Sequence, residues 1–201
     1  MRRRGHTLAE LMVVIAILVL LAGIAMPRFA ASLQGRRGEA AAARLRDTFA
    51  YAHARAVATG LRHVLRIDGE SGRMTLYRFD PVLTGGQPPT APVEEGRDDS
   101  SGFVEDKTAV TAEAFPHGVT LEGLLIAPLE TAPEDPRDIF GARDTAGGDV
   151  ISFYPDGTTD TVGAIVRDER GTAYILTMDG RTGRTQQLDP EETRQVLEGL
   201  R

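Results

Sequence analysis

Apolar residues are concentrated at the N-terminal end of the chain. Residues 11–26 read LMVVIAILVLLAGIAM, sixteen consecutive positions without a charged or polar side chain. As a helix, the 21 residues from His6 to Met26 would rise about 31 Å, which matches a hydrocarbon core of roughly 30 Å. The pattern predicts a transmembrane helix over residues 6–26, preceded by a basic leader at residues 1–5.

Three arginines, Arg2, Arg3 and Arg4, stand directly before this apolar run. Basic flanks of a membrane span stay in the cytoplasm, so we expect a cytoplasmic N-terminus and a C-terminal domain on the opposite side. An ordinary secretory signal peptide is the alternative, because small residues near Met26 could form a cleavage site. The chain would then be a soluble periplasmic domain.

One carboxylate, Glu10, stands at the start of the apolar run. A charged group at the centre of a bilayer opposes insertion by about 2.5–3.5 kcal/mol, and by less near the interface. A signal peptide has no use for such a group. An acid within a membrane segment indicates a functional site, so Glu10 argues for a retained span.

The string GHTLAELMVVIAILVLLAG resembles the N-terminal signal of type IV pilins and type II secretion pseudopilins. The resemblance implies that a prepilin peptidase cleaves after Gly5 and that the new terminus at His6 is N-methylated. It also gives Glu10 the position of the acid that this family uses in assembly. Two positions depart from the family pattern, because His6 replaces the usual Phe and Ala9 replaces a branched aliphatic residue.

Cleavage after Gly5 would give Glu10 a partner. The new amine at His6 lies four residues before Glu10, and positions i and i+4 share one face of a helix. The carboxylate can be neutralised by its own terminus or by that of a neighbouring subunit. We expect the second, because an unpaired carboxylate in lipid favours association with any partner amine. The alternative is a glutamate that extends to the lipid headgroups.

Helical periodicity continues over residues 27–60, where apolar side chains recur at intervals of three and four. We predict an amphipathic helix there, packed on a globular domain. Pro27 is expected to kink this helix, and Gly35 and Gly38 to weaken the next turns by about 1 kcal/mol each relative to Ala. Residues 27–38 would then act either as a joint or as a plain linker.

After Gly60 the period changes from helical to alternating. Residues 63–68 and 73–79 alternate apolar and polar side chains around the turn sequence GESG, which predicts a β-hairpin. Further strands are expected at residues 119–126, 150–154, 163–168 and 172–179, the last two as a second hairpin. The predicted fold is α+β and pilin-like, with a long N-terminal helix on antiparallel sheets and a β-rich domain over residues 61–189.

Two stretches interrupt the predicted sheets. Residues 80–107 and 127–149 are rich in Pro, Gly and acidic residues and are expected to be exposed loops. At the C-terminal end, Asp189 can cap a short helix within residues 190–201, with Pro190 at its first position.

Later motifs narrow the resemblance. The sequences FYPDGTTD at 153–160, TGR at 182–184 and AHARAVATG at 52–60 resemble minor pseudopilins of the GspH/FimT class. This resemblance implies a structural subunit of the type II secretion pseudopilus in the inner membrane, with a periplasmic domain that assists protein export. The implied partners are other pseudopilins, the prepilin peptidase and the inner-membrane secretion platform. A minor pilin of a type IV pilus or DNA-uptake system is the alternative.

Composition excludes several kinds of chemistry. The absence of cysteine removes disulfides, thiolate zinc sites and cysteine nucleophiles. The four histidines lack the spacing of metal ligands, and no Ser/His/Asp arrangement or matched carboxylate pair stands out. We therefore expect a protein that is not an enzyme and that needs no cofactor or metal.

Two weaker possibilities concern charged side chains in turns and loops. Calcium prefers carboxylate ligands of the kind that gather in the first loop, although no EF-hand spacing occurs there; these are Asp98, Asp99, Glu105 and Asp106. DNA would need a basic patch, for which the candidates are Arg167, Arg170, Arg181 and Arg184. The formal net charge of −6, or −9 without residues 1–5, argues against nucleic acid as a partner. The string DGRTGR at 179–184 lacks the Lys of a P-loop and predicts a hairpin turn.

Overall fold

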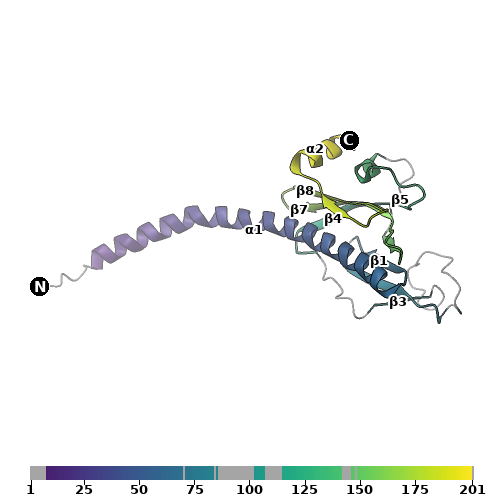
Figure 1. The fold of residues 1–201 in the computed structure, drawn as a ribbon. Helices are drawn as coiled ribbons and strands as arrows, with labels where there is room; N and C mark the ends of the chain where they lie inside the picture. The colour runs from purple at the N-terminus through teal and green to yellow at the C-terminus, as the bar shows by residue number, and fades with distance from the viewer. Residues whose placement is uncertain are drawn as a thin grey trace, which may run out of the picture.

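The chain forms a long N-terminal helix joined to a β-rich body (Figure 1). The computed structural model describes residues 8–69, 71–83, 85, 102–106, 115–141, 146–147 and 149–200. At residues 9–10, 22–35 and 146–147 this description covers the backbone alone. The fold is a mixture of helix and antiparallel sheet, as the sequence predicts.

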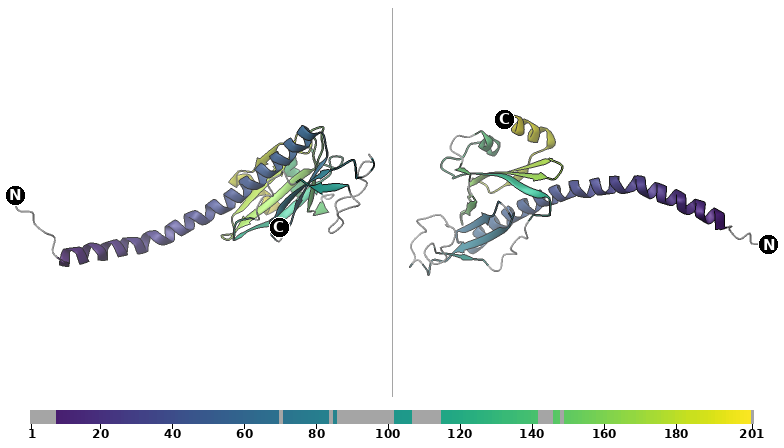
Figure 2. Two further views of the ribbon diagram at one scale, coloured as in Figure 1. Left: turned by 90° about the horizontal axis from the view of Figure 1, so that it is seen from below. Right: turned by 180° about the vertical axis from the view of Figure 1, so that it is seen from behind.

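Helix α1 (Leu8–Thr59) spans 52 residues and has two different surroundings. Its first part extends away from the body, and its second part lies along it (Figures 1 and 2). Figure 2 shows a gradual curve along the whole helix. Helix α1 continues through residue 27 without interruption, so the structure has the one long N-terminal helix that the sequence predicts. A kink at Pro27 stays a prediction.

The first part of α1 exposes its apolar side chains. Residues 11–21 are exposed throughout, and every large apolar side chain among them is at least half exposed. Within the described residues, no helix has the combination of length and apolarity that a membrane span needs.

The first sheet has four strands in the order β3-β2-β1-β6. Its central hairpin, β1 (His63–Ile67) and β2 (Met74–Phe79), confirms the one predicted from alternation, with Leu65 opposite Leu76. Strand β6 (Val150–Phe153) pairs with the other edge of β1. Strand β3 (Phe103–Glu105) closes the β2 side.

The second sheet has five strands in the order β5-β4-β7-β8-β9. Its hairpin, β7 (Thr161–Asp168) and β8 (Ala173–Met178), is the second one expected from the sequence. Strand β4 (Val119–Ala127) pairs with β7 through a bulge between Leu121 and Gly123. The edges are the short strands β5 (Ala146–Gly147) and β9 (Thr185–Gln187).

The core lies between the second part of α1 and the inner faces of both sheets. Leu45 and Phe49 of α1 are fully buried there, in one cluster with Leu65 of the first sheet and Leu176 of the second. Small residues on the same helix face let the sheets approach closely; these are Ala41, Ala42, Ala52 and Ala56.

Gly38 corrects one expectation from the sequence. It is buried, and a Cβ at this position would overlap the ring of Tyr174 on β8. The glycine therefore marks the place where α1 meets the body most closely, rather than a weak turn in a free linker.

The two predicted loops contain short ordered elements, which is a second correction. In the first loop, β3 buries Phe103 edge-on against Phe79, with the ring centroids 5.7 Å apart. In the second loop, a 3-10 helix, η1 (Pro136–Phe140), buries Ile139 completely. Both segments are too short to show periodicity. Phe103 is held by the pairing of β3 with β2, and Ile139 by the contact of η1 with β7.

The outer face of the second sheet is covered by η1 and by helix α2 (Pro190–Gly199). Val196 and Leu197 of α2 pack with Ile175 and Leu188 on this face. The predicted cap is confirmed, because the Asp189 carboxylate accepts hydrogen bonds from the backbone N–H groups of residues 191 and 192.

Candidate functional site

The site residues expected from the N-terminal motif are only partly within the described chain. Gly5 and His6 lie outside the described residues. Glu10 and Pro27 belong to α1, where the description covers their backbone alone. Cleavage, methylation and the assembly role of Glu10 therefore stay predictions.

The three later motifs meet on one face of α1. His53, from the stretch 52–60, lies 2.8 Å through Nε2 from the carbonyl oxygen of Gly157. Since a carbonyl can only accept, the His53 Nε2–H donates this bond. Gly183, from the TGR motif, lies so close to the His53 ring that a Cβ would overlap it. We name this contact of His53 with Gly157 and Gly183 the helix clasp.

The two turns of the helix clasp are also joined to each other. The backbone N–H of Thr159 donates to the carbonyl of Gly180 at 2.7 Å, and the Gly180 N–H donates to the Thr161 hydroxyl at 3.1 Å. Asp156 accepts bonds from the backbone N–H and hydroxyl of Thr158, and these lower the pKa of the Asp156 carboxyl. The motifs thus form one docking surface that fixes the second part of α1 to both sheets.

An ionic cluster with two buried members, Asp106 and His63, and the partly exposed Arg55 lies beside the same part of α1. Arg55 Nε donates to the Asp106 carboxylate at 3.0 Å, and His63 Nε2 lies 3.7 Å from the same carboxylate oxygen. Asp106 is 5% exposed and the His63 side chain is fully buried. This arrangement corrects the calcium hypothesis for Asp106, whose carboxylate is an ion-pair partner that holds β3 to α1 and β1.

His63 is held in a defined tautomer. Its Nδ1–H donates to the carbonyl oxygen of Leu61 at 3.0 Å, which leaves Nε2 facing Asp106 without a hydrogen bond of its own. Burial lowers the pKa of His63, opposed by the bond to Leu61 and by the charge of Asp106. The neutral ring is therefore the form that the fold stabilises.

A second buried carboxylate belongs to the FYPDGTTD motif. Asp160 accepts a hydrogen bond from the backbone N–H of Ser152 at 2.7 Å, and Arg62 donates to the Ser152 hydroxyl at 2.9 Å. The Arg62 guanidinium also lies over the ring of Tyr154, 4.9 Å from its centroid. Burial raises the pKa of Asp160. This network is structural. The contribution of Arg62 could not be predicted, because no sequence motif links it to residues 152–160.

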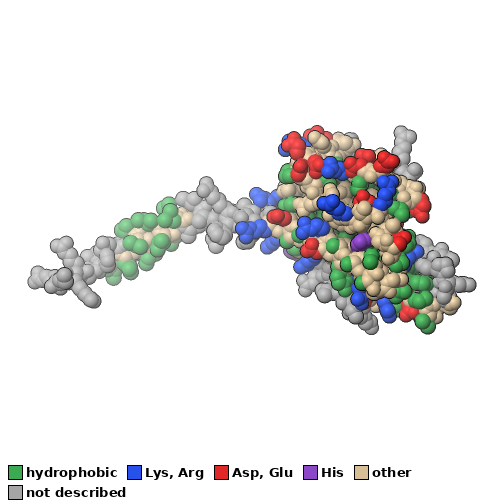
Figure 3. Space-filling view, viewed as in Figure 1, with side chains coloured by type: hydrophobic (Ala, Val, Ile, Leu, Met, Phe, Trp, Pro, Cys, Tyr) green, Lys and Arg blue, Asp and Glu red, His purple; other side chains and the backbone are tan. Residues whose placement is uncertain are grey.

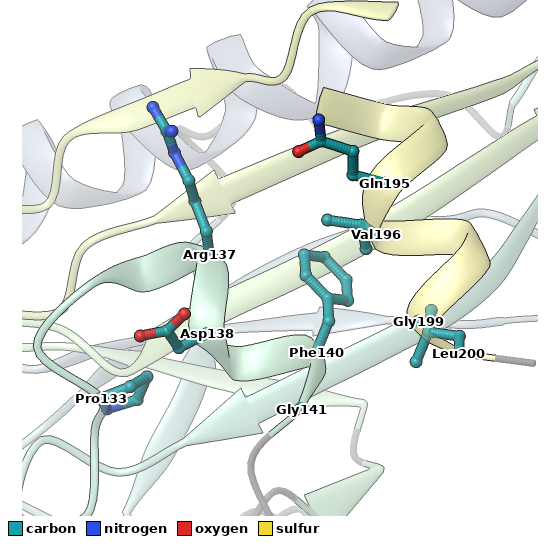
Figure 4. Close-up of a pocket in the computed structure, with 9 residues that line it drawn as sticks. All are labelled: Pro133, Arg137, Asp138, Phe140, Gly141, Gln195, Val196, Gly199 and Leu200. Carbon is teal, nitrogen blue, oxygen red and sulfur yellow. The ribbon is translucent and has the colours of Figure 1, made fainter. Parts of the chain in front are cut away.

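A groove separates η1 from α2 on the outer face of the second sheet, with the ring of Phe140 pointing into it (Figure 4). Its volume is about 500 Å³. Its lining residues are Pro133, Arg137, Asp138, Phe140, Gly141, Gln195, Val196, Gly199 and Leu200. An ion pair of 2.8 Å between Arg137 and Glu192 also joins the two helices. The groove is open and holds no arrangement of acid, base and nucleophile.

The four arginines considered for DNA binding do not form one patch. Arg167 and Arg170 lie at the β7–β8 turn, whereas Arg181 and Arg184 lie at the β8–β9 turn, at the other end of β8. Six strand residues separate these ends by about 20 Å. Arg167 is also paired with Glu122 at 2.6 Å. The turn predicted for DGRTGR is confirmed.

Metal ligands do not gather in the part of the chain that the structure describes. No group of three or more His, Asp or Glu side chains there could hold a metal ion. Asp98 and Asp99 lie outside the described residues.

Comparison with known proteins agrees with the N-terminal motif and the fold. The family model of the prokaryotic N-terminal methylation motif matches residues 1–26. No curated protein matches the chain. Two structures of the minor pseudopilin EpsH from the type II secretion system of Vibrio cholerae are similar at 11% identity. They cover 77% of this chain, and 98% and 95% of their own, with TM-scores of 0.44 and 0.50.

The match with a TM-score of 0.50 shows a shared fold and, at 11% identity, nothing beyond it. Motif and fold together define a pilin-like chain. More particularly, the chain carries a prepilin-type N-terminal methylation motif on the fold of a minor pseudopilin.

Proposed function

We propose that this protein is a minor pseudopilin, a structural subunit of a type II secretion pseudopilus that assists protein export. Residues 6–26 anchor it in the inner membrane, with the β-rich body in the periplasm. The prepilin peptidase removes residues 1–5 on the cytoplasmic side, and other pseudopilins then receive the exposed helix. The methylation motif and the pseudopilin fold support this proposal.

One observation carries the proposal furthest. Residues 11–21 expose apolar side chains on every face of α1, whereas the second part of the same helix buries one apolar face against the body. A soluble domain gains nothing from such a projecting apolar helix, because exposed apolar surface of this extent favours association. A lipid bilayer, and then a bundle of similar helices, would cover it.

Within that bundle, Glu10 has the assembly role. The amine that cleavage creates at His6 is the only new positive charge next to the span, so it is the natural partner of the Glu10 carboxylate in a neighbouring subunit. The protein acts through packing and charge pairing, and the described groove contributes no catalytic group.

Mass spectrometry of the N-terminus of the membrane-fraction protein tests the proposal. We expect a mature chain that begins at N-methylated His6, and an uncleaved chain when Gly5 is replaced in a Gly5→Leu variant. A mature start near Met26 in the soluble fraction would show an ordinary signal peptide and would overturn the proposal.

Filament assembly tests the role of Glu10 separately. Glu10→Gln and Glu10→Ala subunits should be processed normally and yet be excluded from filaments, as measured by co-purification with other pseudopilins. Equal incorporation of wild-type and variant subunits would remove Glu10 from the assembly mechanism.

A further inference from the structure

The arginines at the base of the body form an unexplained charge asymmetry. Residues 27–38, which we name the neck, contain three arginines and no acid, whereas residues 39–201 have a net charge of −11. Arg36 and Arg37 are exposed. Figure 3 shows basic side chains where α1 meets the body.

Positive charge at this position has a cost. Basic residues close to a span favour the cytoplasmic side, so arginines on the exported side oppose the orientation that Arg2, Arg3 and Arg4 favour. They do not serve the docking of α1 either, because the face that packs on the body carries Gly38 and apolar residues. The contacts of α1 with the body therefore do not account for the two exposed arginines Arg36 and Arg37.

Helix geometry puts the neck close to the membrane surface. Arg36 follows Met26 by ten residues of continuous helix, which is about 15 Å of rise. The headgroup layer occupies roughly 5–7 Å of that distance, so the remaining gap is about one Debye length, 8–10 Å. The tilt of a span, about 20° on average, and the length of an arginine side chain both shorten the gap.

The charged residues nearest the neck come from the β7–β8 turn and from α1 itself. The β7–β8 turn lies beside Gly38 and contributes the exposed Arg170 and Glu169, while the Asp168 carboxylate is buried and accepts the backbone N–H groups of that turn. Glu39 follows Gly38 on the side of the body. Arg36 and Arg37 precede Glu39 along α1, so they lie closer than this acid to the proposed membrane span.

We propose that Arg36 and Arg37 bind the headgroup phosphates of anionic phospholipids on the side of the membrane from which the body projects. The inference rests on the proposed membrane anchor and goes beyond it, because it assigns a lipid class to the neck. A bound lipid surface would hold the body at a fixed height and orientation before the subunit leaves the membrane. Attraction to anionic lipid would also be released at high salt.

Lipid retention by the full-length chain tests the inference. The protein is purified in a non-ionic detergent with equal amounts of phosphatidylglycerol and phosphatidylcholine, and the bound lipids are quantified by mass spectrometry. We expect a preference for phosphatidylglycerol that falls about five-fold to thirty-fold in Arg36→Gln/Arg37→Gln, since each arginine at a membrane surface contributes about a factor of five. Salt at 0.5 M should reduce the wild-type preference in the same way.

The matched control is Arg181→Gln/Arg184→Gln. Both arginines are exposed and lie at the end of the body near His53, about 24 Å along α1 from the neck. This variant changes net charge equally and should keep the wild-type preference. An equal loss in both variants, or no loss in either, would overturn the inference.

Two further outcomes distinguish what failed. If the neck binds the acidic body of another copy instead, Arg36→Gln/Arg37→Gln would keep the lipid preference and lose chemical crosslinking between copies, which would overturn the lipid assignment alone. If the wild-type chain stays in the soluble fraction and retains neither lipid, the membrane anchor of the proposed function fails as well.

Discussion

The two parts of α1 belong to one helix but differ in how their apolar side chains are distributed and covered. Residues 11–21 are apolar on every face and exposed, which suits a helix that is surrounded by lipid or by other helices. From Gly38 to Ala56 only one face is apolar, and it is buried by both sheets. Among the described residues, the core of the body therefore includes only the second part of α1, and the first part is available for contacts outside the body.

The docked face also differs in the size of its side chains. It alternates small residues, which let the sheets approach, with the large residues Leu45 and Phe49, which fill the core. The exposed part carries large apolar residues throughout. Matched substitutions in the two parts should therefore have very different effects on stability.

The largest difference should come from truncating one large side chain in each part. Phe49→Ala should lower the free energy of unfolding by about 3–5 kcal/mol, because it opens a cavity in the core. Leu18→Ala should change it by less than about 0.5 kcal/mol, because Leu18 is 59% exposed on the part of α1 that extends away from the body. Urea unfolding of the full chain in detergent, followed by circular dichroism, measures both. Similar losses would show that the first part also stabilises the body.

The next effect concerns the boundary between the two parts. Gly38→Ala would add about 1 kcal/mol of stability if the glycine were in a free helical linker. Because a Cβ would overlap the Tyr174 ring, we expect the variant to lose about 1–3 kcal/mol. The same unfolding measurement gives the sign. A second substitution, Tyr174→Leu, should recover part of the loss, and a stabilised Gly38→Ala variant would contradict the close approach.

Local signals explain what could be predicted from the sequence. The hairpins around residues 63–79 and 163–178 follow from alternation and turn residues, and the cap at Asp189 follows from its own carboxylate and the next three positions. The resemblance of 153–160 and 182–184 to pseudopilins was also visible. Their role in docking α1 could not be predicted from the sequence, because both turns contact the ring of His53, which is more than 100 residues before them in the chain.

Non-local contacts explain what could not be predicted. Phe103 and Ile139 stand in stretches whose composition is typical of loops. Phe103 is buried because β3 pairs with β2 and brings it against Phe79, and Ile139 is buried because η1 packs on β7. Asp106 pairs with Arg55 and faces His63, residues far from it in sequence and without a shared periodicity. The composition of residues 80–107 predicts an exposed loop around Asp106, and only the fold reveals the two partners of its carboxylate.

A smaller effect should follow from opening the helix clasp. His53→Ala removes the hydrogen bond to the Gly157 carbonyl and the ring that packs on Gly183, and should cost about 1–2 kcal/mol. Amide hydrogen exchange should rise at the β8–β9 turn while the β1–β2 hairpin keeps its protection. Ala54→Ser, an exposed change on the neighbouring position, is the control. Uniform exchange throughout the body would mean that the clasp does not act locally.

The smallest effect should be visible only as a dependence on pH. Burial lowers the pKa of His63 in the folded state. In the unfolded chain the imidazole has its ordinary pKa of about 6.5. Below that pH the unfolded state binds a proton that the folded state resists. The free energy of unfolding should then decrease between pH 7 and pH 5. The charge of Asp106 favours the protonated ring and reduces this loss, whereas the charge of Arg55 disfavours the protonated ring and adds to the loss.

His63→Asn keeps a donor for the Leu61 carbonyl and cannot titrate, so its stability should be flatter over the same range whatever its absolute value. The raised pKa of Asp160 acts in the opposite direction, since its protonated form favours the fold. The stabilisation by Asp160 appears as the pH falls through the raised pKa of its carboxyl, above the ordinary value of about 3.9. It is common to the wild type and to His63→Asn. The difference between their pH profiles therefore isolates His63, and identical profiles would show that the imidazole does not resist protonation in the folded state.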